Sequence, residues 1–493
     1  MKPITVVIPY SPEPFFEKTL SFLTKSVWIE EVVIVSQGPV HGEISGSRVL
    51  ITESLSSSQA IGSILEGIRT PHLLFLPNVQ PVSFESKGLE RFLQAAGAPK
   101  TGIVYSSFYD ESRTGKTLHP LNDYQLGSVC DDFDFGPLLL FSIPAIRRSL
   151  KKYPLIPGTT FAGLYDLRLK VSIGYAVAHL SEPLYTVAEA EEISRREKIF
   201  AYVDPQNRAI QREMEIACTD YLKKIGAYLP PVFRTAEPTT ETFPVEASVV
   251  IPVRNRKGTI AEAVRSAFSQ QTDFSFNVIV VDNHSNDGTT AILTDLARRS
   301  PNLIHIVPKR TDLGIGGCWN EALQYEACGR YVVQLDSDDL YSSPLALQKL
   351  VHMLRQTDFG MVIGSYTLVD SELKEIPPGL IDHREWTEEN GHNNALRVNG
   401  LGAPRAFRTD LMRKIRFPNV SYGEDYAAAL RICREYRIGR IYEGLYLCRR
   451  WPGNSDSGLT IEAANQNDAF KDKIRTTEIR ARQKMNQSNI LTL

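Results

Sequence analysis

The chain has 493 residues, of which 42% are hydrophobic and 23% are charged, which is the composition of an ordinary globular protein. Its 55 Lys and Arg residues nearly balance its 57 Asp and Glu residues, so no strong net field favours nucleic acid or an anionic membrane as a partner. Because single hydrophobic cores stop growing at about 250–300 residues, this length predicts two or three domains.

The beginning of the chain shows no secretory signal. Met1 is followed almost at once by the apolar run 4–9, which leaves no room for a charged region, an apolar core and a cleavage site. The most apolar later stretch, 137–146, is shorter than the ~20 residues of a spanning helix and contains Pro144. The six cysteines are scattered and form no C-x-x-C pair. These features predict a cytoplasmic protein without a transmembrane segment or structural zinc, and they leave peripheral membrane contact open.

Two similar β-α-β patterns follow each other along the chain. In the first, the strand-like run 5–10 precedes a helical stretch and then the run 32–35. In the second, the run 248–253 precedes an amphipathic helix and then the run 278–281. The runs are unbroken in Val and Ile, as expected for strands of a parallel sheet that helices cover on both faces. Both halves are therefore predicted to be doubly wound, Rossmann-like α/β folds.

The repeat and the composition between its copies define the predicted domains. A charged helical segment separates the halves and is followed by a Pro/Thr-rich stretch that ends at Pro244, which is typical of a spacer. The polar, helix-prone end of the chain is predicted to be a solvated or packing helix, with a membrane-surface or partner helix as the alternative. The predicted divisions are an α/β domain at 1–190, a helical segment and linker at 191–244, an α/β domain at 245–455 and a helical tail at 456–493.

The strongest chemical signal is an acidic cluster directly after an apolar strand of the second half. Asp336, Asp338 and Asp339 follow the run 331–335, at the carboxyl end of a parallel strand, where α/β sheets bind ligands. Three clustered acids repel one another unless a positive group binds there. Mg²⁺ or Mn²⁺ takes one or two carboxylates and completes its shell with diphosphate oxygens and water. The cluster predicts a metal with a phosphorylated ligand; the alternative is an acidic turn that caps the next helix.

Three further motifs are predicted to reach the same edge of the sheet. Asp282 ends the second strand and can accept hydrogen bonds from a base and a ribose. The glycines of 314–317 let a backbone approach a ligand closely before the helix that contains Asn320. Glu424 and Asp425 precede a predicted helix, where a carboxylate can take the proton of a hydroxyl. Each motif has a structural alternative, namely a simple turn, a helix start or acids that suit the helix dipole.

In this order, these motifs resemble the family 2 glycosyltransferases of the GT-A fold. The resemblance implies that Asp425 is the catalytic base, that Glu424 supports its position or the acceptor, and that the sugar is transferred with inversion. It also implies a donor site in which Pro252, Arg254 and Asn255 line the nucleotide and Asp282 contacts the base, with Gly316 and Asn320 beside them. Asp336 is implied near the ribose or the diphosphate. Asp338 is implied to bind the metal, and Asp339 to share or replace the role of Asp338.

Arg449, Arg450 and Trp451 follow the last predicted strand. The arginines can neutralise a leaving diphosphate or hold an anionic acceptor, and the tryptophan can stack on a sugar. The alternative is a surface pair of arginines with a packed tryptophan. Processive members of the family have Q-x-x-R-W at this place, whereas this chain has Leu447 in the position of the glutamine. A non-processive enzyme is therefore expected.

The first half lacks the corresponding acids. Strand-by-strand matching places Ser36 opposite Asp282, and Pro77, Val79 and Gln80 opposite the three acids of the cluster. The same matching places Gly163 and Leu164 opposite the Glu-Asp pair. The first half is therefore expected to be a degenerate GT-A-like copy.

The expected function is transfer of a sugar from a UDP- or GDP-sugar to a hydroxyl of a glycan, a lipid-linked or a small-molecule acceptor, with Mn²⁺ or Mg²⁺. One alternative is a sugar-nucleotide pyrophosphorylase, which would normally have a Gly-rich basic loop after the first strand. The other is a non-catalytic carbohydrate-binding or scaffold protein. The sequence makes no prediction of the sugar, the base, the acceptor or the oligomeric state.

Overall fold

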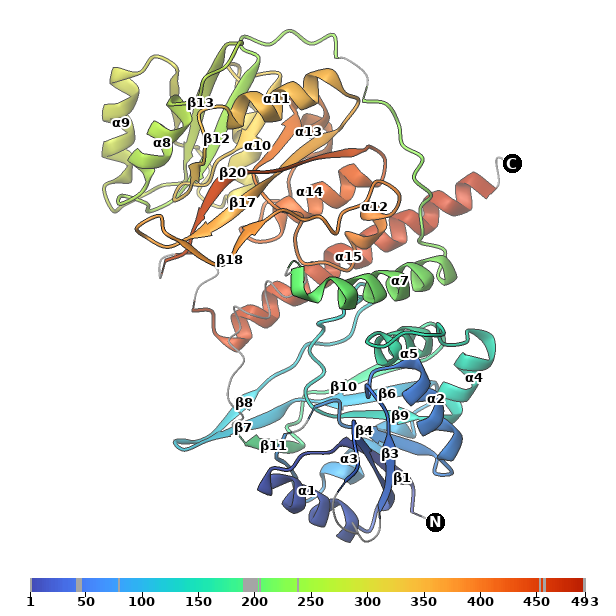
Figure 1. Ribbon diagram of the computed structural model, residues 1–493. Helices are drawn as coiled ribbons and strands as arrows, with labels where there is room; N and C mark the ends of the chain where they lie inside the picture. The colour runs from blue at the N-terminus through green and yellow to red at the C-terminus, as the bar shows by residue number, and fades with distance from the viewer. Residues whose placement is uncertain are drawn as a thin grey trace. The chain divides into compact units, whose positions relative to one another are not determined.

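The structure is a computed structural model that describes residues 2–40, 47–78, 80–188, 203, 205–236, 239–451, 454 and 458–490. The chain divides into two compact units. Unit 1 combines Met1–Ile199, Gln206–Tyr228 and Leu459–Leu493, and unit 2 combines Phe200–Pro205 with Leu229–Gly458. Each unit has a central sheet with helices packed on it, which confirms the predicted α/β class (Figure 1).

Unit 1 is built around a seven-stranded sheet whose inner strands are apolar. β1 and β2 are parallel neighbours, and each residue from Ile4 to Ile8 is buried. This unbroken burial is expected of strands that are covered on both faces. In spatial order the strands are β10 (Ala176–Leu180), β6 (Thr101–Ser106), β9 (Leu139–Ser142), β4 (His72–Phe75), β1 (Ile4–Pro9), β2 (Ile29–Ser36) and β3 (Ser47–Ile51).

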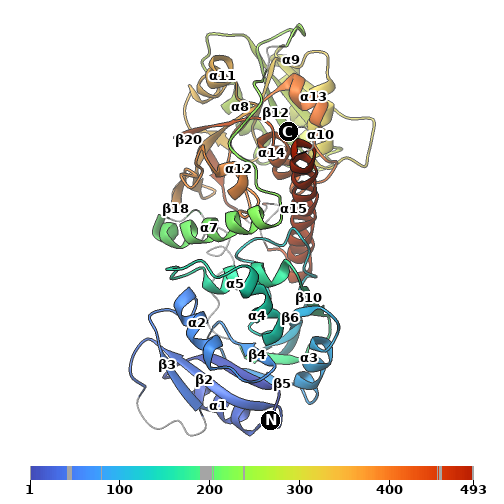
Figure 2. The ribbon, with the colours of Figure 1, turned by 90° about the vertical axis from the view of Figure 1, so that its right-hand side faces the viewer.

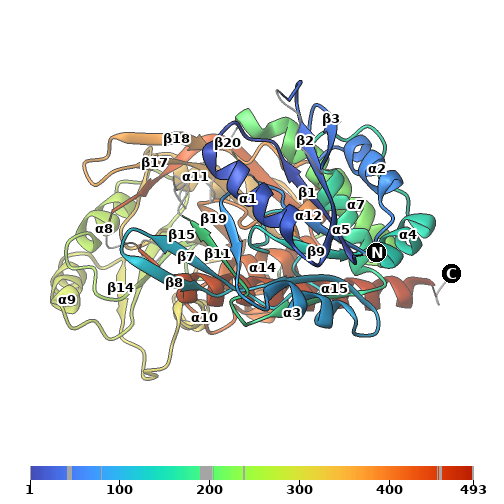
Figure 3. The same ribbon diagram turned by 90° about the horizontal axis from the view of Figure 1, so that it is seen from below.

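Two helices of unit 1 begin at serine residues. The Oγ of Ser57 accepts a hydrogen bond from the N–H of Ala60, and the Oγ of Ser142 accepts one from Ala145, so each satisfies an N–H that a helix start leaves free. α1 packs on β2, as the view from below shows (Figure 3). The α-helices described in this unit are α1 (Pro14–Lys25), α2 (Ser58–Gly67), α3 (Gly88–Ala96), α4 (Ile143–Lys152), α5 (Gly163–Ser172), α7 (Arg208–Lys224) and α15 (Ile461–Ile490).

Unit 2 contains a nine-stranded sheet in which one inner strand runs against its neighbours. β12, β13 and β15 are parallel, and β19 lies antiparallel between β15 and β17. The strands in spatial order are β14 (Leu303–Ile306), β13 (Phe276–Asp282), β12 (Ala247–Val253), β15 (Tyr331–Gln334), β19 (Arg405–Arg408), β17 (Met361–Val369), β20 (Ile438–Arg449) and β16 (Leu340–Tyr341), and β18 (Glu375–Ile381) pairs with β17.

Helices cover both faces of this sheet. Val249, Ile251 and Val253 of β12 share one hydrophobic core with residues of α8 and α11. Val250 points the other way and is equally buried, and α10 contacts β12 and β13, so α10 covers the opposite face. The α-helices described in unit 2 are α8 (Ile260–Phe268), α9 (Thr289–Arg299), α10 (Ile315–Gln324), α11 (Ala346–Gln356), α12 (Gly391–Asn394), α13 (Thr409–Ile415) and α14 (Glu424–Cys433).

The central sheets of the two units repeat one strand order. Unit 1 reads β3-β2-β1-β4-β9-β6-β10, and unit 2 reads β14-β13-β12-β15-β19-β17-β20. In each series only β9 or β19 is antiparallel to its neighbours, and the remaining adjacent pairs are parallel. The repeat that the sequence predicts therefore has a counterpart in both the order and the direction of the strands.

A small second sheet in unit 1 extends this correspondence. Its strands are β5 (Val82–Phe84), β11 (Tyr185–Ala188), β7 (Phe108–Ser112) and β8 (Gly115–His119). β5 pairs antiparallel with β11 as β16 does with the end of β20, and β11 pairs parallel with β7 as β20 does with β17. β8 pairs antiparallel with β7 as β18 does with the end of β17. The long strands β17 and β20 of unit 2 thus correspond to pairs of shorter strands in unit 1, which lie in two separate sheets.

α15 completes unit 1 although it follows unit 2 in the sequence. Ser128 donates a hydrogen bond from Oγ to the Asp472 carboxylate at 2.6 Å, and the N–H of Gly127 donates to Thr476 Oγ1 at 2.8 Å. Farther along the helix, Gln483 donates to the carbonyl of Ile225, just after α7 (Figures 1 and 2). Of the predicted alternatives for the end of the chain, the packing helix therefore agrees with the structure. No described helix is both long enough and apolar enough to cross a membrane.

The packing of α15 can be tested at Gly127, where an added Cβ would overlap the carbonyl of Asp472 and the N–H of Thr476. We expect Gly127→Ala to lower the free energy of unfolding by about 1–3 kcal/mol, because backbone atoms cannot move aside easily. Gly174→Ala is the matched control, since its Cβ would have no neighbour within 4 Å. Thermal unfolding with limited proteolysis checks this, and equal stability of the two variants would contradict the described packing.

Candidate active site

The predicted chemical residues gather where the parallel strands of unit 2 end. In the register of the sheet, Val253 pairs with Asp282, and Val250 pairs with Gln334, two residues before Asp336. β12, β13 and β15 therefore deliver their carboxyl-terminal loops to one edge. Carboxyl ends of parallel strands are where open α/β sheets bind ligands.

Asp282 is fully buried and is held by three groups. Its carboxylate accepts hydrogen bonds from the N–H of Ser285 at 3.0 Å and from Thr290 Oγ1 at 2.5 Å, and His305 Nε2 lies 3.5 Å away. Burial alone would raise the pKa of this carboxyl, but the hydrogen bonds outweigh it and hold the pKa well below its usual range. The side chain is thus a fixed, ionised acceptor at the end of β13.

Four side chains form a connected polar chain at the centre of the edge, which we call the Arg405 network: Asp336, Gln334, Arg405 and Asp425. Gln334 donates from Nε2 to both carboxylate oxygens of Asp336, at 3.0 and 3.1 Å, and accepts at Oε1 from Arg405 at 3.0 Å. The other nitrogen of Arg405 lies 2.6 Å from Asp425 Oδ2. One guanidinium therefore links the acid after β15 to the acid at the start of α14.

Arg405 and Gln334 are residues of this edge that the sequence did not predict. Arg405 begins β19, whose antiparallel pairing places it beside Ile363 of β17 and next to the end of β15. No local motif marks it. The sequence feature that could have indicated a residue such as Arg405 was the charge of the acids. Acids that converge at a sheet edge require a cation from some other part of the chain.

Glu424 is 9% exposed, and its Oε2 has no hydrogen-bond partner. Burial, together with the neighbouring charge of Asp425, raises the pKa of Glu424 to about 8. By contrast, the side chain of Asp425 is 31% exposed, and its Oδ1 accepts from the N–H of Tyr426 in the first turn of α14. The pair therefore contains one enclosed, mostly protonated acid and one accessible carboxylate.

Asp338 is surrounded by donors. Its Oδ2 accepts hydrogen bonds from Trp451 Nε1 at 3.1 Å and from Asn454 Nδ2 at 3.4 Å, and Arg256 Nε lies 3.5 Å away. Arg256 was not predicted as a site residue. It follows Asn255 in the loop after β12, and the structure brings this loop to the acidic cluster.

Asp339, predicted to share or replace the metal role of Asp338, is held by the protein backbone. It is 5% exposed, and its Oδ1 accepts the backbone N–H of Arg449 at 2.7 Å. Burial and the charges of Asp336 and Asp338 raise the pKa of Asp339 well above its ordinary value. The guanidinium of Arg449 pairs with Glu262 of α8 at 2.8 Å, so both side chains already have partners within the protein.

Gly316 and Asn320 also take structural positions that the sequence did not predict. A Cβ at Gly316 would overlap the carbonyl of Pro418, and its N–H donates to the carbonyl of Val420. The amide of Asn320 forms hydrogen bonds with both the N–H and the carbonyl of Phe417, at 3.0 and 2.8 Å. Both residues thus hold the loop that leads into α14.

The remaining predicted residues lie at the end of β12 and on the loops of this edge. Pro252 is partly buried in β12, and Arg254 is exposed after it. Asn255 has a left-handed backbone with φ of 54°, and its N–H donates to Ser285 Oγ at 2.9 Å, which ties the loop after β12 to the loop after β13. Arg450 continues the edge after β20, and its N–H donates to the carbonyl of Val369.

The carboxylates of this edge set a limit on a metal site. Within the described part of the chain, no three His, Cys, Asp or Glu side chains form a group that could hold a metal ion. A cage made only of protein ligands is therefore not formed by these residues. The side chains of Asp336 and Asp338 fit the other mode, in which Mg²⁺ or Mn²⁺ is held by one or two carboxylates while phosphate oxygens and water supply the remaining ligands.

Comparison with known proteins gives a family match within unit 2 and several similar proteins. Residues 248–417 match the family model described as Glycosyl transferase family 2. The chain is 25% identical over 206 residues to the UDP-Glc:alpha-D-GlcNAc-diphosphoundecaprenol beta-1,3-glucosyltransferase WfgD of Escherichia coli, which covers 41% of this chain and 76% of that protein.

Two further similarities cover smaller shares of the similar proteins. The chain is 24% identical over 213 residues to a poly(ribitol-phosphate) beta-glucosyltransferase of Bacillus spizizenii, and this match spans 42% of the chain but only 33% of the relative. Among solved structures, S. aureus TarS 1–349 in complex with UDP-GlcNAc aligns at 23% identity with a TM-score of 0.37, covering 48% of this chain and 72% of that one.

The enclosed carboxyl of Glu424 predicts a pH-dependent stability. Because its pKa is about 8 in the folded chain, against an ordinary value of 4.5, the folded state binds the extra proton between these pH values. The free energy of unfolding should therefore fall as the pH rises from about 4.5 to 8. Glu424→Gln removes this effect, so at pH 9 it should be more stable than the original chain by roughly 1–3 kcal/mol, with a smaller difference at pH 5.

Chemical denaturation at the two pH values measures this difference. Glu326→Gln is the matched control, because Glu326 is exposed at the end of the segment after α10. A stability gain that is equal at pH 5 and pH 9 would contradict the proposed protonation of Glu424.

Proposed function

We propose that unit 2, in which residues 248–417 match the family model described as Glycosyl transferase family 2, is a glycosyltransferase that transfers one sugar from a nucleoside-diphosphate donor to an acceptor hydroxyl with inversion. The Arg405 network carries this proposal. It joins an acid of the loop after β15, on the donor side, to Asp425 at the start of α14. A displacement reaction needs such a pair of groups on the two sides of the reacting carbon.

Asp425 is proposed as the general base. Its side chain is accessible, and both of its oxygens are oriented, one by Arg405 and one by the N–H of Tyr426. A helix start is a rigid place for such a group. Asp425 would take the proton of the acceptor hydroxyl as that oxygen forms its bond to the sugar, while the nucleoside diphosphate leaves with the electron pair of the broken bond.

Donor binding is proposed for the loops after β12, β13 and β15. Asp282 and Asn255 would receive the nucleoside, with Pro252 and Arg254 along it, and Asp336 and Asp338 would face the diphosphate. A divalent cation held at these two carboxylates would stabilise the charge that develops on the departing diphosphate. Arg450 and Trp451 are proposed at the acceptor side.

The donor is proposed to be a UDP- or GDP-sugar, used with Mn²⁺ or Mg²⁺. The name of one relative supports UDP first, since WfgD is named for UDP-Glc. A non-processive reaction is proposed because Leu447, where processive enzymes have glutamine, is an apolar residue of β20 paired with Leu340 of β16. The acceptor is proposed to be a glycan, a lipid-linked sugar or a small molecule.

Unit 1 is proposed to be a GT-A-like copy that has lost its donor site. Its sheet repeats the strand order of unit 2, and the register identifies equivalent positions. Every member of the Arg405 network has an apolar counterpart there: Phe75 for Gln334, Pro77 for Asp336, Leu139 for Arg405 and Leu164 for Asp425. These residues offer neither a base nor a carboxylate for a metal.

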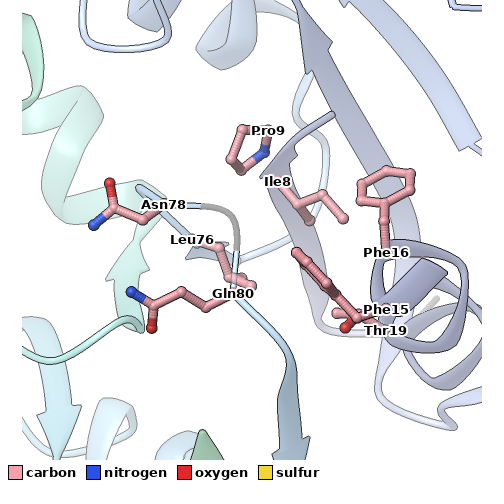
Figure 4. Close-up of a pocket in the computed structure, with 8 residues that line it drawn as sticks. All are labelled: Ile8, Pro9, Phe15, Phe16, Thr19, Leu76, Asn78 and Gln80. Carbon is pink, nitrogen blue, oxygen red and sulfur yellow. The ribbon is translucent and has the colours of Figure 1, made fainter. Parts of the chain in front are cut away.

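Two features of unit 1 support the loss of binding. A small pocket at the equivalent edge has no charged side chain among its lining residues, which are Ile8, Pro9, Phe15, Phe16, Thr19, Leu76, Asn78 and Gln80 (Figure 4). The N–H groups of Thr160, Phe161 and Ala162 before α5 donate to the carboxylate of Glu213 from α7, at 3.1, 2.7 and 3.1 Å. The chain's own acid thus occupies the helix start that corresponds to α14.

The base assignment is tested with Asp425→Asn. We expect transfer to fall by about 10²–10⁴-fold while nucleotide binding is retained, because the amide keeps the shape but cannot accept the proton. A donor screen by nucleotide release with Mn²⁺ gives the rate, and calorimetry gives the affinity. Asp295→Asn, in an exposed pair with Arg299 on α9, is the control. Transfer by Asp425→Asn at the original rate would refute the assignment.

The loss of the donor site in unit 1 predicts the binding stoichiometry. Titration of the full chain with the nucleotide found in that screen should give one site per chain. Asp338→Ala should abolish Mn²⁺-dependent binding completely, because no second set of carboxylates exists among the equivalent residues of unit 1. Two sites, or one site that survives in Asp338→Ala, would contradict the proposed degenerate role.

A further inference from the structure

Three loops of unit 2 meet at the carboxylate of Asp338. The loop after β12 supplies Arg256, the loop after β15 supplies Asp338, and the segment after β20 supplies Trp451 and Asn454. A hydrogen bond from a side chain to the backbone ties the first two loops together, since Thr259 Oγ1 donates to the carbonyl of Ser337 at 2.9 Å. The meeting point is therefore built by the fold of the sheet edge and does not depend on one mobile side chain.

The positively charged side chain of Arg256 lies close to Asp338 Oδ2, an oxygen that a metal ion would bind. Arg256 Nε is 3.5 Å from Asp338 Oδ2, and the guanidinium carbon lies 5.8 Å from the centre of the Trp451 ring, within reach of a cation–π interaction. The two ionic side chains are 19% and 12% exposed. An enclosed ion pair of this kind is electrostatically stronger than one at an open surface.

The contact is nevertheless incomplete as a hydrogen bond. Arg256 Nε is buried and has no acceptor within hydrogen-bond geometry, and its N–H therefore lacks the partner that a buried donor normally has. The same guanidinium reaches the carbonyl of Asn255 at 3.2 Å with another nitrogen. Because Arg256 has an unused N–H donor beside the acidic cluster, it is suited to leave the carboxylate of Asp338 for an acceptor that forms better hydrogen bonds.

The neighbouring acids are already engaged by other donors. Both oxygens of Asp336 accept from Gln334, and Asp339 is buried against the N–H of Arg449. A divalent cation that arrives at this edge must therefore compete with Arg256 for Asp338. The diphosphate that would accompany the cation is a bidentate acceptor, which is the geometry that a guanidinium matches best.

We propose that Arg256 is an exchangeable counter-ion, which holds Asp338 in the donor-free chain, yields this carboxylate to the metal and then binds the diphosphate of the donor. The proposal rests on the proposed function, because it assumes a nucleoside-diphosphate donor with a divalent cation. The proposal predicts positive coupling between the binding of the metal and the binding of the nucleotide. Metal alone must displace Arg256, whereas metal with a nucleotide also provides the guanidinium with a new partner.

The test measures Mn²⁺ binding to the full-length protein by the electron paramagnetic resonance of free Mn²⁺, with and without UDP, and with GDP as a second probe. For the original chain we expect weak binding of Mn²⁺ alone and binding at least about tenfold tighter with the nucleotide. For Arg256→Ala and Arg256→Gln we expect Mn²⁺ alone to bind about three- to tenfold tighter, and the enhancement by nucleotide to shrink by a similar factor.

Two further variants make the result specific. Arg265→Ala removes an exposed arginine of α8 and should leave both quantities unchanged. Arg256→Lys keeps the charge without the planar fork, so it should keep the weak binding of metal alone and lose part of the enhancement. Circular dichroism and thermal unfolding identify any variant that does not fold, and the conclusion then rests on the folded substitutions at position 256.

The outcomes separate this inference from the proposed function. If the original chain binds Mn²⁺ with nucleotide, and Arg256→Gln shows the same metal affinity and the same enhancement, Arg256 is not a counter-ion and the inference is overturned. If the original chain binds no Mn²⁺ with either UDP or GDP, the metal-dependent function itself fails and this inference fails with it.

Discussion

The site of unit 2 depends on one electrostatic constraint, which is that the acids gathered at a sheet edge need a cation supplied by the fold. Arg405 meets this need by binding Asp425 directly and Asp336 through Gln334. Because β19 runs antiparallel between β15 and β17, its first residue lies at the edge where the parallel strands end. The antiparallel direction of β19 therefore places the guanidinium of Arg405 among the loops that contain the acids.

Unit 1 shows the same constraint from the opposite side. Its strand order matches that of unit 2, yet all four positions of the Arg405 network carry apolar residues. A buried polar network with only some of its members leaves unpaired charges, which cost more than an apolar core of the same shape. The loss of one member would therefore favour the loss of the others. The four apolar residues agree with the proposal that unit 1 is a GT-A-like copy without a donor site.

Local sequence patterns predicted the α/β class, the convergence of the acids and the position of Asp282, because strand ends and helix starts can be read from short runs of residues. They did not predict Arg405, Gln334 or Arg256, whose roles depend on partners distant in the sequence. They also predicted Gly316, Asn320 and Asp339 at ligands, and the structure shows in addition that these residues hold the loop before α14 and the end of β20. A glycine or an acid beside a site has the same appearance in sequence whether it contacts the ligand or the neighbouring backbone.

The place of α15 in unit 1 has a consequence for synthesis on the ribosome. Residues such as Gly127 and Ser128 emerge early, but the helix that covers them follows all of unit 2. At translation rates of about 5–20 residues per second, the surface that receives α15 would stay uncovered for roughly 10–50 s. The nascent first unit must therefore wait, incomplete and open to chaperones, until the second unit has been made.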